Sequence, residues 1–410
     1  MRAIIAGAGE TGRLVAAQLS ADLHDVVLVD TSAASLEAAE EILDIQTYQG
    51  DCTHRGVQSS LDVGEAGAFI AFTNDSSANV LSAAFASQAG CRMTIARVDN
   101  PSFLGRDAGV ERDVLGIDYL LCPTHLMVTE LVRQLAGSHC SLVIPVGESR
   151  TQLAAVPLGS NSPLLGRPAS SVTLDHAVVT AVVRDRDVRP LPDISSLDID
   201  DELLVFADAD HLSTATKKIT GASNQRVLIV GGGRTGTRLA GLLAKGGDRV
   251  TLVETAQARC ESISADLPDV TVLNGDGTSV AFLQDLHIDT VDAIVAATSE
   301  DEVNLMVSLL ARQMGVEDSF IEVHRPGYAE LYRQLGVQGV VGSYDVLTNA
   351  ATSAMKRETV ANHGPIPNTP LELFEAEVPS GGWGAANGLP LPKSVRVLAV
   401  LRDGVVQEQR

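Results

Sequence analysis

A glycine-rich motif occurs twice in this chain, 224 residues apart, and it constrains the fold more than any other feature. The first copy is Gly7-Ala8-Gly9-Glu10-Thr11-Gly12 and the second is Gly231-Gly232-Gly233-Arg234-Thr235-Gly236. Each copy follows a short apolar run and precedes a helix-like stretch. In such a motif the first glycine permits a tight strand-to-helix turn, the second lets the backbone approach a phosphate, and the third lets the helix pack closely on the strand. The sequence therefore predicts two helix N-termini that each favour a bound diphosphate.

Other short motifs repeat together with the glycine motifs. A second apolar run ends in Asp30 in the first copy and in Glu254 in the second, each 18 residues past the last glycine. This spacing is close to the roughly 20 residues expected for a carboxylate that holds ribose hydroxyls. Two further motifs correspond at an offset of 225: Asp51-Cys52-Thr53 with Asp276-Gly277-Thr278, and Thr73-Asn74-Asp75 with Thr298-Ser299-Glu300. The chain is therefore an internal duplication.

Length and composition exclude several classes of protein. A chain of 410 residues is too long for one typical domain, and 45% apolar with 20% charged residues is ordinary for a soluble globular protein. The net charge of −22 argues against nucleic-acid binding, which needs a basic surface. The acidic, lysine-poor composition is interpreted as GC-biased codon usage with a soluble acidic surface, and adaptation to a salt-rich cytoplasm is the alternative.

The location of the protein is also predicted from the apolar runs. None approaches the roughly 18–20 residues that cross a bilayer, and the chain enters a strand at its start, so we expect no signal peptide and a cytoplasmic location. The five cysteines are scattered, which favours reduced thiols over disulfides or a zinc site. The nine histidines lack ligand spacing, so no metal site is assigned.

The alternation of elements predicts the fold class and the domains. Apolar β-rich runs alternate with amphipathic stretches over residues 1–120 and 225–342, which predicts α/β folding with two Rossmann-like, doubly wound parallel sheets. Each is followed by a small β-rich α+β module, and the last module is expected to be truncated. The predicted domains are 1–137 (Rossmann-like, nucleotide-binding), 138–221 (small α+β, regulatory), 222–361 (Rossmann-like, nucleotide-binding) and 370–410 (partial α+β, regulatory).

One helix candidate after each Rossmann-like half carries a broad apolar stripe. The stripes are Met127, Val128, Leu131, Val132, Leu135 and Ala136 in the first, and Val346, Leu347, Ala350, Ala351, Ala354 and Met355 in the second. Such a face is typical of core packing. A crossover helix exchanged between subunits has the same pattern, so both interpretations stay open.

The order of these motifs resembles one known family. The module order, the two glycine motifs, Gly50-Asp51-Cys52-Thr53, Thr73-Asn74-Asp75 with Asn79, and Ala96-Arg97-Val98-Asp99-Asn100-Pro101 are similar to those of the TrkA family of potassium-uptake regulators, which carry tandem RCK domains (regulator of potassium conductance). The resemblance covers nearly the whole chain. It implies that the Rossmann-like halves bind NAD(H) or ATP/ADP as regulatory ligands. It also implies a homo-oligomeric ring, a dimer or tetramer, that gates an integral membrane potassium transporter subunit of Trk type from the inner face of the cell membrane.

The resemblance also assigns site residues. The glycine loop, Gly7, Gly9, Glu10, Thr11 and Gly12, would hold the phosphates, and Asp30 the ribose. Asp51 and Cys52 would lie at the adenine edge, Thr73, Asn74 and Asp75 at the far side, and Arg97 near the phosphates or the neighbouring subunit. The second-site residues are Gly231, Gly233, Arg234, Thr235, Gly236, Glu254, Asp276 and Thr298. Glu322 replaces Arg97 there, and Arg234 would supply the missing cation. Unequal sites follow, with the first favouring the more highly charged ligand.

Simpler interpretations remain open at each position. The glycines alone would make tight turns without a ligand, and Asp30 and Glu254 would be ordinary strand ends. Asp51 and Asp276 would be turn aspartates, and Arg97 one half of a surface ion pair.

Function has alternatives of its own. No nucleophile motif and no catalytic acid or base is visible near either glycine motif, so we expect a protein that is not an enzyme and assign no catalytic residue. The rival is an NAD-dependent oxidoreductase in which residues 138–215 form a substrate domain. A nucleotide sensor that acts on a soluble enzyme or another transporter is a third possibility.

Overall fold

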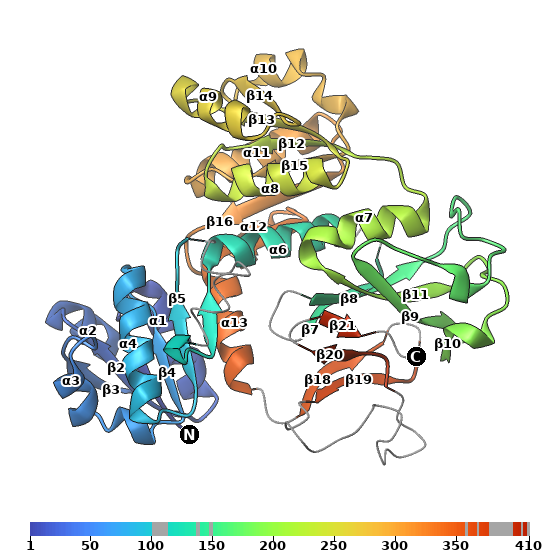
Figure 1. Cartoon of the computed structure of the whole chain (residues 1–410). Coiled ribbons are helices and arrows are strands. Elements are labelled where there is room, and N and C mark those ends of the chain that lie inside the picture. Colours follow the sequence, from blue (N-terminus) through green and yellow to red (C-terminus); the bar gives the residue numbers. More distant parts are fainter. Residues whose placement is uncertain are drawn as a thin grey trace. The chain divides into compact units, whose positions relative to one another are not determined.

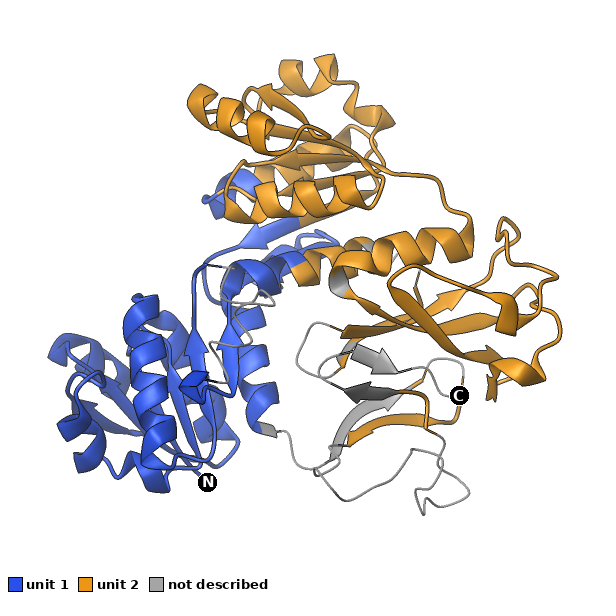
Figure 2. Ribbon diagram, viewed as in Figure 1, with its two compact units in different colours: residues 1–128, 299–305, 321–357 blue, residues 129–298, 306–320, 358–410 orange. Residues whose placement is uncertain are grey.

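The computed structural model of the chain describes eight stretches and divides into two compact units (Figures 1 and 2). The described stretches are residues 1–100, 114–136, 140–146, 151–356, 360–366, 369–376, 397–402 and 405–407. The first unit contains residues 1–128, 299–305 and 321–357, and the second contains residues 129–298, 306–320 and 358–410.

The first Rossmann-like half is built on a six-stranded parallel sheet in the order β3-β2-β1-β4-β5-β6. Its strands are β1 (Arg2–Ala6), β2 (Asp25–Asp30), β3 (Gln46–Gln49), β4 (Ala68–Ala71), β5 (Thr94–Arg97) and β6 (Tyr119–Leu121). The central residues Ile4 and Ile5 are fully buried because helices cover both faces of the sheet. The strand order reverses between β1 and β4, which is where ligands bind in open α/β sheets.

Helices cover the two faces of this sheet. They are α1 (Glu10–Ala21), α2 (Ala33–Glu40), α3 (Arg55–Ser60) and α4 (Ser76–Ala89), with a 3₁₀ turn at η1 (Val63–Glu65). Val15 and Leu19 of α1 pack with Ile5 on one face, whereas Ala83 and Ala86 of α4 belong to the core cluster on the other face. The helices therefore bury one apolar side each and leave the loops at the carboxyl ends of the strands for a site.

The second half repeats this topology, with the strand order β14-β13-β12-β15-β16-β17. The strands are β12 (Arg226–Val230), β13 (Arg249–Glu254), β14 (Thr271–Asn274), β15 (Ala293–Ala296), β16 (Asp318–Val323) and β17 (Gly339–Gly342). The helices are α8 (Arg234–Lys245), α9 (Gln257–Asp266), α10 (Val280–Asp285), η6 (Ile288–Thr290), α11 (Asp301–Gln313) and α12 (Tyr328–Gln334). The predicted fold class, two Rossmann-like parallel sheets, is confirmed.

A smaller antiparallel sheet lies in the second unit, in the order β10-β9-β11-β8-β7. Its elements are β7 (Leu142–Val146), β8 (Thr151–Pro157), η4 (Ala169–Ser171), β9 (Ala177–Arg184), β10 (Asp187–Pro190), η5 (Leu191–Asp193), β11 (Glu202–Asp208) and α7 (Ala209–Thr220). Leu212 and Ile219 of α7 pack on one face of this sheet. This is the β-rich module expected after the first Rossmann-like half.

The other face of the small sheet is covered by the last part of the chain. Ile366, Leu373 and Leu398 pack there in one core cluster with Leu153 and Phe206. The described strands of this part form two hairpins: β18 (Val360–Pro365) with β19 (Glu372–Ala376), and β20 (Val400–Arg402) with β21 (Val405–Gln407). Residues 378–392, which their glycine and proline content predicts to be a loop, lie outside the described residues.

The two striped helices are α6 (Pro123–Ala136) and α13 (Ser343–Lys356). The stripe of α13 is buried, as core packing requires, but in the core of the first half: Leu347 and Ala351 share a cluster with Val15, Ala16 and Leu19 of α1. Figure 2 shows α13 in the same compact unit as the first sheet. Helix α13 follows β17 of the second half and packs on the first half of the same chain. Exchange of such a helix between subunits stays a prediction.

None of the helices in the described stretches is long and apolar enough to cross a membrane.

Candidate functional site

The first glycine loop joins β1 to α1 and has the backbone shape that its sequence predicts. Gly7 has φ of +110°, and a Cβ there would lie 2.8 Å from the carbonyl oxygen of Phe72. A Cβ on Gly12 would lie 1.8 Å from the carbonyl oxygen of Gly7, so only glycine fits both positions. At Gly9 a Cβ would meet nothing within 4 Å. Gly7 and Gly12 therefore shape the turn, and Gly9 leaves the space in front of the helix N-terminus open.

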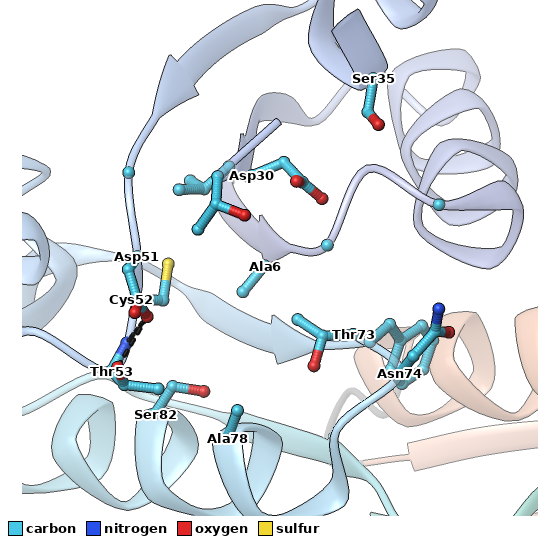
Figure 3. Close-up of a pocket in the computed structure, with 16 residues that line it drawn as sticks. Ala6, Asp30, Ser35, Asp51, Cys52, Thr53, Thr73, Asn74, Ala78 and Ser82 are labelled. Atoms are coloured by element: carbon cyan, nitrogen blue, oxygen red, sulfur yellow. Dashed lines mark hydrogen bonds between the residues drawn. The ribbon is translucent and has the colours of Figure 1, made fainter. Parts of the chain in front are cut away.

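A cavity of about 320 Å³ lies beside this loop (Figure 3). Its volume is within the roughly 300–1,000 Å³ of small-molecule sites. Seven predicted site residues line it: Gly7, Gly9, Asp30, Asp51, Cys52, Thr73 and Asn74. Sequence reasoning missed Thr31, Ser35, Phe72 and Ser82, which also line it. Of these four residues, Ser35 could have been predicted most easily, because it lies in the first turn of α2, the helix that follows Asp30 at the end of β2.

Asp30, at the end of β2, braces the glycine loop. Its two carboxylate oxygens accept hydrogen bonds from the backbone N–H groups of Ala8 at 2.7 Å and Ser32 at 2.8 Å. Each carboxylate oxygen can accept a further hydrogen bond. Asp30 therefore both holds the loop in place and offers acceptors to a hydroxyl-bearing ligand in the cavity.

Asp51 and Cys52 form a polar corner opposite the loop. Asp51 accepts from the Thr53 hydroxyl at 2.7 Å and from the Thr53 N–H at 2.8 Å, and these bonds lower the pKa of Asp51 below its ordinary value. Burial, with the nearby charges of Asp51 and Asp30, raises the pKa of Cys52 to about 12. Figure 3 shows the Cys52 sulfur pointing into the space between the two aspartates. This thiol is neutral and lines the wall of the cavity.

Thr73 is fixed by the buried side chain of Asn79, which was not among the predicted site residues. Asn79 accepts from the Thr73 N–H at 2.9 Å and hydroxyl at 2.7 Å, and its own amide nitrogen donates to the carbonyl oxygens of Thr73 and Arg97, both at 3.0 Å. This clamp ties β5 to the end of β4. It positions the far wall of the cavity.

Five predicted residues of the first site do not line the cavity. Gly12 and Thr11 are buried in the turn, and Glu10 is exposed at the start of α1. Asp75 caps α4 by accepting from the N–H groups of Ser77 and Ala78. The Arg97 guanidinium donates to Asp99 at 3.1 and 3.2 Å, the ion pair that was the simpler interpretation of this residue. A direct ligand contact of these residues stays a prediction.

The second loop repeats the first in detail. Gly231 has φ of +113°, and a Cβ on Gly236 would lie 2.0 Å from the carbonyl oxygen of Gly231. Glu254 accepts from the Gly232 N–H at 2.8 Å, as Asp30 does from Ala8. Burial opposes the charge of Glu254, but bonds from the Ala256 and Gly232 N–H groups outweigh it and hold the pKa of Glu254 below its ordinary value.

The adenine-edge motif is repeated as well. Asp276 accepts from the Thr278 hydroxyl at 2.7 Å and N–H at 2.8 Å, and these bonds lower the pKa of Asp276. Asn304 donates to the Glu322 carbonyl oxygen at 2.9 Å, as Asn79 does to that of Arg97. Duplication has therefore kept the backbone-fixing bonds of both halves.

The two loops differ in what their side chains do. The Arg259 Nε donates to the carbonyl oxygen of Gly232 at 2.7 Å, and the corresponding first-site residue is the much smaller Ser35. Arg234 is exposed at the start of α8, where the first half has Glu10, and Thr235 is buried like Thr11. Glu322, the counterpart of Arg97, is 6% exposed. Gly233 is exposed. A Cβ on Gly233 would make an ordinary van der Waals contact, 3.8 Å, with the carbonyl oxygen of Ala297, the residue before Thr298.

Fold and loops together define a class: a duplicated Rossmann-like protein with a phosphate-type glycine loop in each half. The family model of the TrkA-N domain matches residues 3–123 and 227–343, more than half of the chain. The chain belongs to the TrkA-N domain family.

Relatives agree over nearly the whole length. The chain is 27% identical over 403 residues to the Trk system potassium uptake protein TrkA homolog of Archaeoglobus fulgidus, covering 98% of this chain and 92% of the relative. It is 26% identical over 425 residues to the Trk system potassium uptake protein TrkA of Vibrio alginolyticus, covering 98% and 91%.

Solved structures share the fold. The GsuK channel bound to NAD aligns with a TM-score of 0.61 at 18% identity, covering 89% of this chain and 67% of that one. The GsuK RCK domain aligns with a TM-score of 0.57 at 19% identity, covering 89% and 80%.

Proposed function

We propose that this protein is a nucleotide-binding regulatory subunit of a potassium uptake system. The observation that carries the proposal is a polar cavity at the switch point of a Rossmann-like sheet, in a chain whose named relatives are Trk potassium uptake proteins over nearly their full length. Its partner is an integral membrane transporter subunit, which it regulates from the cytoplasmic side. The protein acts as a homo-oligomer, a dimer or tetramer ring.

The regulatory ligand is NAD(H) or ADP/ATP, since all carry a diphosphate and an adenosine ribose. The diphosphate binds the N–H groups at the start of α1, in the open space in front of Gly9. The ribose hydroxyls bind the remaining acceptor positions of Asp30. The adenine lies against Asp51 and Cys52, with Thr73 and Asn74 on the other wall. One protein of the same fold, GsuK, has a solved structure described as bound to NAD and another described as bound to ADP.

The two sites are unequal in this proposal, but the expected preference changes. The sequence favoured the first site for the more highly charged ligand because of Arg97. In the structure Arg97 is paired with Asp99, and Glu10 adds a negative charge at the start of α1, where the second half has Arg234. We therefore propose that the first site prefers diphosphate ligands and that the second, if occupied, tolerates an additional phosphate.

The mechanism is a population shift and not a reaction. A ligand favours one arrangement of the ring only by its differential affinity for the two arrangements, and the ring then acts on the transporter. In this proposal Asp30 and Asp51 have binding roles, because both already accept hydrogen bonds from backbone N–H groups of the cavity wall. We propose a regulator without catalysis because the named relatives are potassium uptake proteins.

Calorimetric titration of the full chain with NADH, NAD, ADP and ATP, together with mass measurement of the assembly, tests this function. We expect at least one of the four nucleotides to bind, and we expect the protein to be an oligomer. Co-expression of the protein with its transporter should raise potassium uptake. No binding by any of the four at millimolar concentration would contradict the proposal. Turnover of NADH with small carbonyl compounds would instead favour the oxidoreductase.

A further inference from the structure

A buried glutamine lies directly behind one end of the first cavity. Gln58 of α3 is 3% exposed, and its side-chain nitrogen donates to the carbonyl oxygen of Cys52 at 2.8 Å and to that of Ser82 at 2.9 Å. Cys52 and Ser82 both line the cavity, and Gln58 is not among the lining residues. Gln58 therefore acts on the cavity through the two residues that it holds.

The two hydrogen bonds of Gln58 connect two walls of the cavity. Cys52 lies on the loop between β3 and α3, and Ser82 lies in α4. Figure 3 shows Ser82 beside the turn that contains Asp51 and Cys52. A side-chain amide nitrogen carries two hydrogens, and Gln58 donates to one carbonyl oxygen on each wall. Gln58 therefore fixes the width of this end of the cavity, which is the end that holds the base in the proposed function.

The second half shows that the fold does not require a polar side chain at this place. At the offset of 225, Leu283 corresponds to Gln58 and Val307 to Ser82, and both of these apolar residues are fully buried. A buried polar group costs stability unless it is paired, and apolar groups of the same shape can replace a bonded pair at little cost. Stability of the fold alone therefore does not explain why the first half has Gln58.

The two halves also differ at the position of the thiol. Gly277 corresponds to Cys52, and a Cβ on Gly277 would lie 2.4 Å from Cγ1 of Val230. Val230 in turn corresponds to Ala6, which lines the first cavity. The second half therefore has no space for a side chain where the first half has Cys52, so the halves differ here in shape as well as in polarity.

Asp51 supplies a group that can distinguish one base from another. Both hydrogen bonds from Thr53 go to Oδ1 of Asp51, and Oδ2 lies 3.3 Å from Nδ1 of His54. A carboxylate oxygen can accept more than one hydrogen bond, so Oδ2 can accept from the amino group of adenine. The oxo oxygen that replaces this amino group in hypoxanthine has no hydrogen to donate. Asp51 therefore favours adenine, provided that the base is held at hydrogen-bonding distance.

From these contacts we propose that Gln58 is a positioning residue for the base. By joining Cys52 to Ser82, it holds the base end of the first cavity at the width at which Asp51 selects adenine. The inference rests on the proposed function and adds the part of the ligand that the first site recognises. A leucine side chain has no donor, so the second half, with Leu283, selects its base less strongly.

The test is a calorimetric titration of the full chain with ADP and with inosine diphosphate, which has the oxo group in place of the amino group. At the tighter binding event, the wild type is expected to prefer ADP about tenfold. Gln58→Leu introduces the residue of the second half. We expect this variant to bind ADP about five- to tenfold more weakly and inosine diphosphate nearly as the wild type does, which lowers the preference below about threefold.

Two further variants separate positioning from stability. Gln58→Met keeps the length of the side chain without its donor and should reproduce the result of Gln58→Leu. Thr94→Val is the matched control, because Thr94 is fully buried and its hydroxyl is 2.9 Å from the carboxylate of Asp118. Thr94 begins β5, at the opposite end of the sheet from the cavity. Its replacement should lower the melting temperature and leave the preference for ADP unchanged.

The outcomes distinguish the positioning role from the proposed function. If Gln58→Leu weakens ADP and inosine diphosphate equally, or leaves ADP binding unchanged, the positioning role is overturned and nucleotide binding stands. Equal binding of the two diphosphates by the wild type overturns it in the same way. If both Gln58 variants fail to fold, Gln58 is needed for folding and the inference falls. If the wild type binds no nucleotide, the proposed function falls as well.

Discussion

The two glycine loops share their backbone and differ in their side chains. Gly12 and Gly236 approach the preceding turn equally closely, and Asp30 and Glu254 accept the same loop N–H. The corresponding positions Ser35 and Arg259 differ. The small side chain of Ser35 leaves space beside the first loop, whereas Arg259 donates a hydrogen bond to the second loop. Bonds that hold the turn are needed for folding in both halves, whereas groups that meet a ligand are free to change in either. The shared backbone bonds reflect the duplication, and the different side chains lead us to expect different ligand affinities at the two sites.

The largest expected effect comes from blocking one loop at a time. Gly9 has an extended backbone with φ of −68°, and a Cβ on it would have no atom within 4 Å, so Gly9→Val should fold with stability close to the wild type. The added side chain fills the diphosphate space, and we expect a loss of nucleotide affinity of about 100-fold or more. Gly233→Val is the matched variant of the second loop and should leave the tighter binding event unchanged. Calorimetry measures both. Equal losses would mean that the two sites are equivalent.

Gly12→Ala separates folding from binding at the same loop. Its Cβ would lie 1.8 Å from the Gly7 carbonyl oxygen, so we expect destabilisation of about 3 kcal/mol or more, visible in thermal unfolding. A variant with wild-type stability would show that the turn relaxes, and would remove the structural argument for the third glycine.

The acidic strand ends come next in size. Asp30→Ala removes the acceptor for the Ala8 N–H and for the ribose, and we expect nucleotide affinity to fall about 10- to 100-fold, since hydrogen bonds to charged groups contribute roughly 1.5–3 kcal/mol. Glu254→Ala should affect only the weaker binding event. Titration of both variants with ADP measures the difference. An unchanged nucleotide affinity in Asp30→Ala would mean that Asp30 only stabilises the glycine loop and does not bind the ligand.

Exchanging the side chains beside the loops should have a moderate effect. Arg259→Ser gives the second loop the residue of the first, and we expect binding at the second site to strengthen several-fold because the space beside Gly232 opens. Ser35→Arg should weaken the first site by a similar factor. Weaker nucleotide binding by Arg259→Ser would contradict this prediction, because Arg259 would then be a residue that contacts the ligand.

The smallest effect is one of pH. The pKa of Asp51 is lowered by its bonds from Thr53, so these bonds stabilise the fold above the unfolded pKa of about 3.9 and the contribution is lost as the pH falls through the lower folded value. Thr53→Ala should therefore lower the unfolding free energy at pH 7 by less than about 1 kcal/mol, since Asp51 is 44% exposed, and the difference should shrink as the pH falls through the folded pKa of Asp51. Denaturant unfolding over a series of pH values from 7 downwards measures this. A difference that does not shrink with falling pH would have another cause.

Much of the fold and of the loop geometry was predictable, because both depend on local rules. The glycines at 7, 12, 231 and 236 are required by close backbone approach, and the continuous apolar runs predict buried parallel strands. The position of α13 was not predictable. An apolar stripe indicates that one face of the helix is buried, but it does not indicate which half of the chain that face packs against. Arg97 was placed near phosphates by resemblance, and its pairing with Asp99 depends on a turn geometry that spacing does not reveal.

Residues of the cavity wall were found where they belong to a motif and missed where they do not. Asp30, Asp51 and Thr73 stand in repeated motifs, whereas Ser35 and Ser82 come from helix surfaces that face the cavity only because of how the helices pack. A comparison of the two halves position by position, Ser35 with Arg259, would have drawn attention to the first of them.

The last hairpins have a consequence for how this duplicated protein can be divided. Ile366, Leu373 and Leu398 shield one side of the module that follows the first Rossmann-like half, while α13 fills a gap in that first half itself. A gene cut in the middle would yield two fragments with uncovered apolar surfaces, prone to precipitate. We therefore expect each repeat to need the other in order to cover its apolar faces.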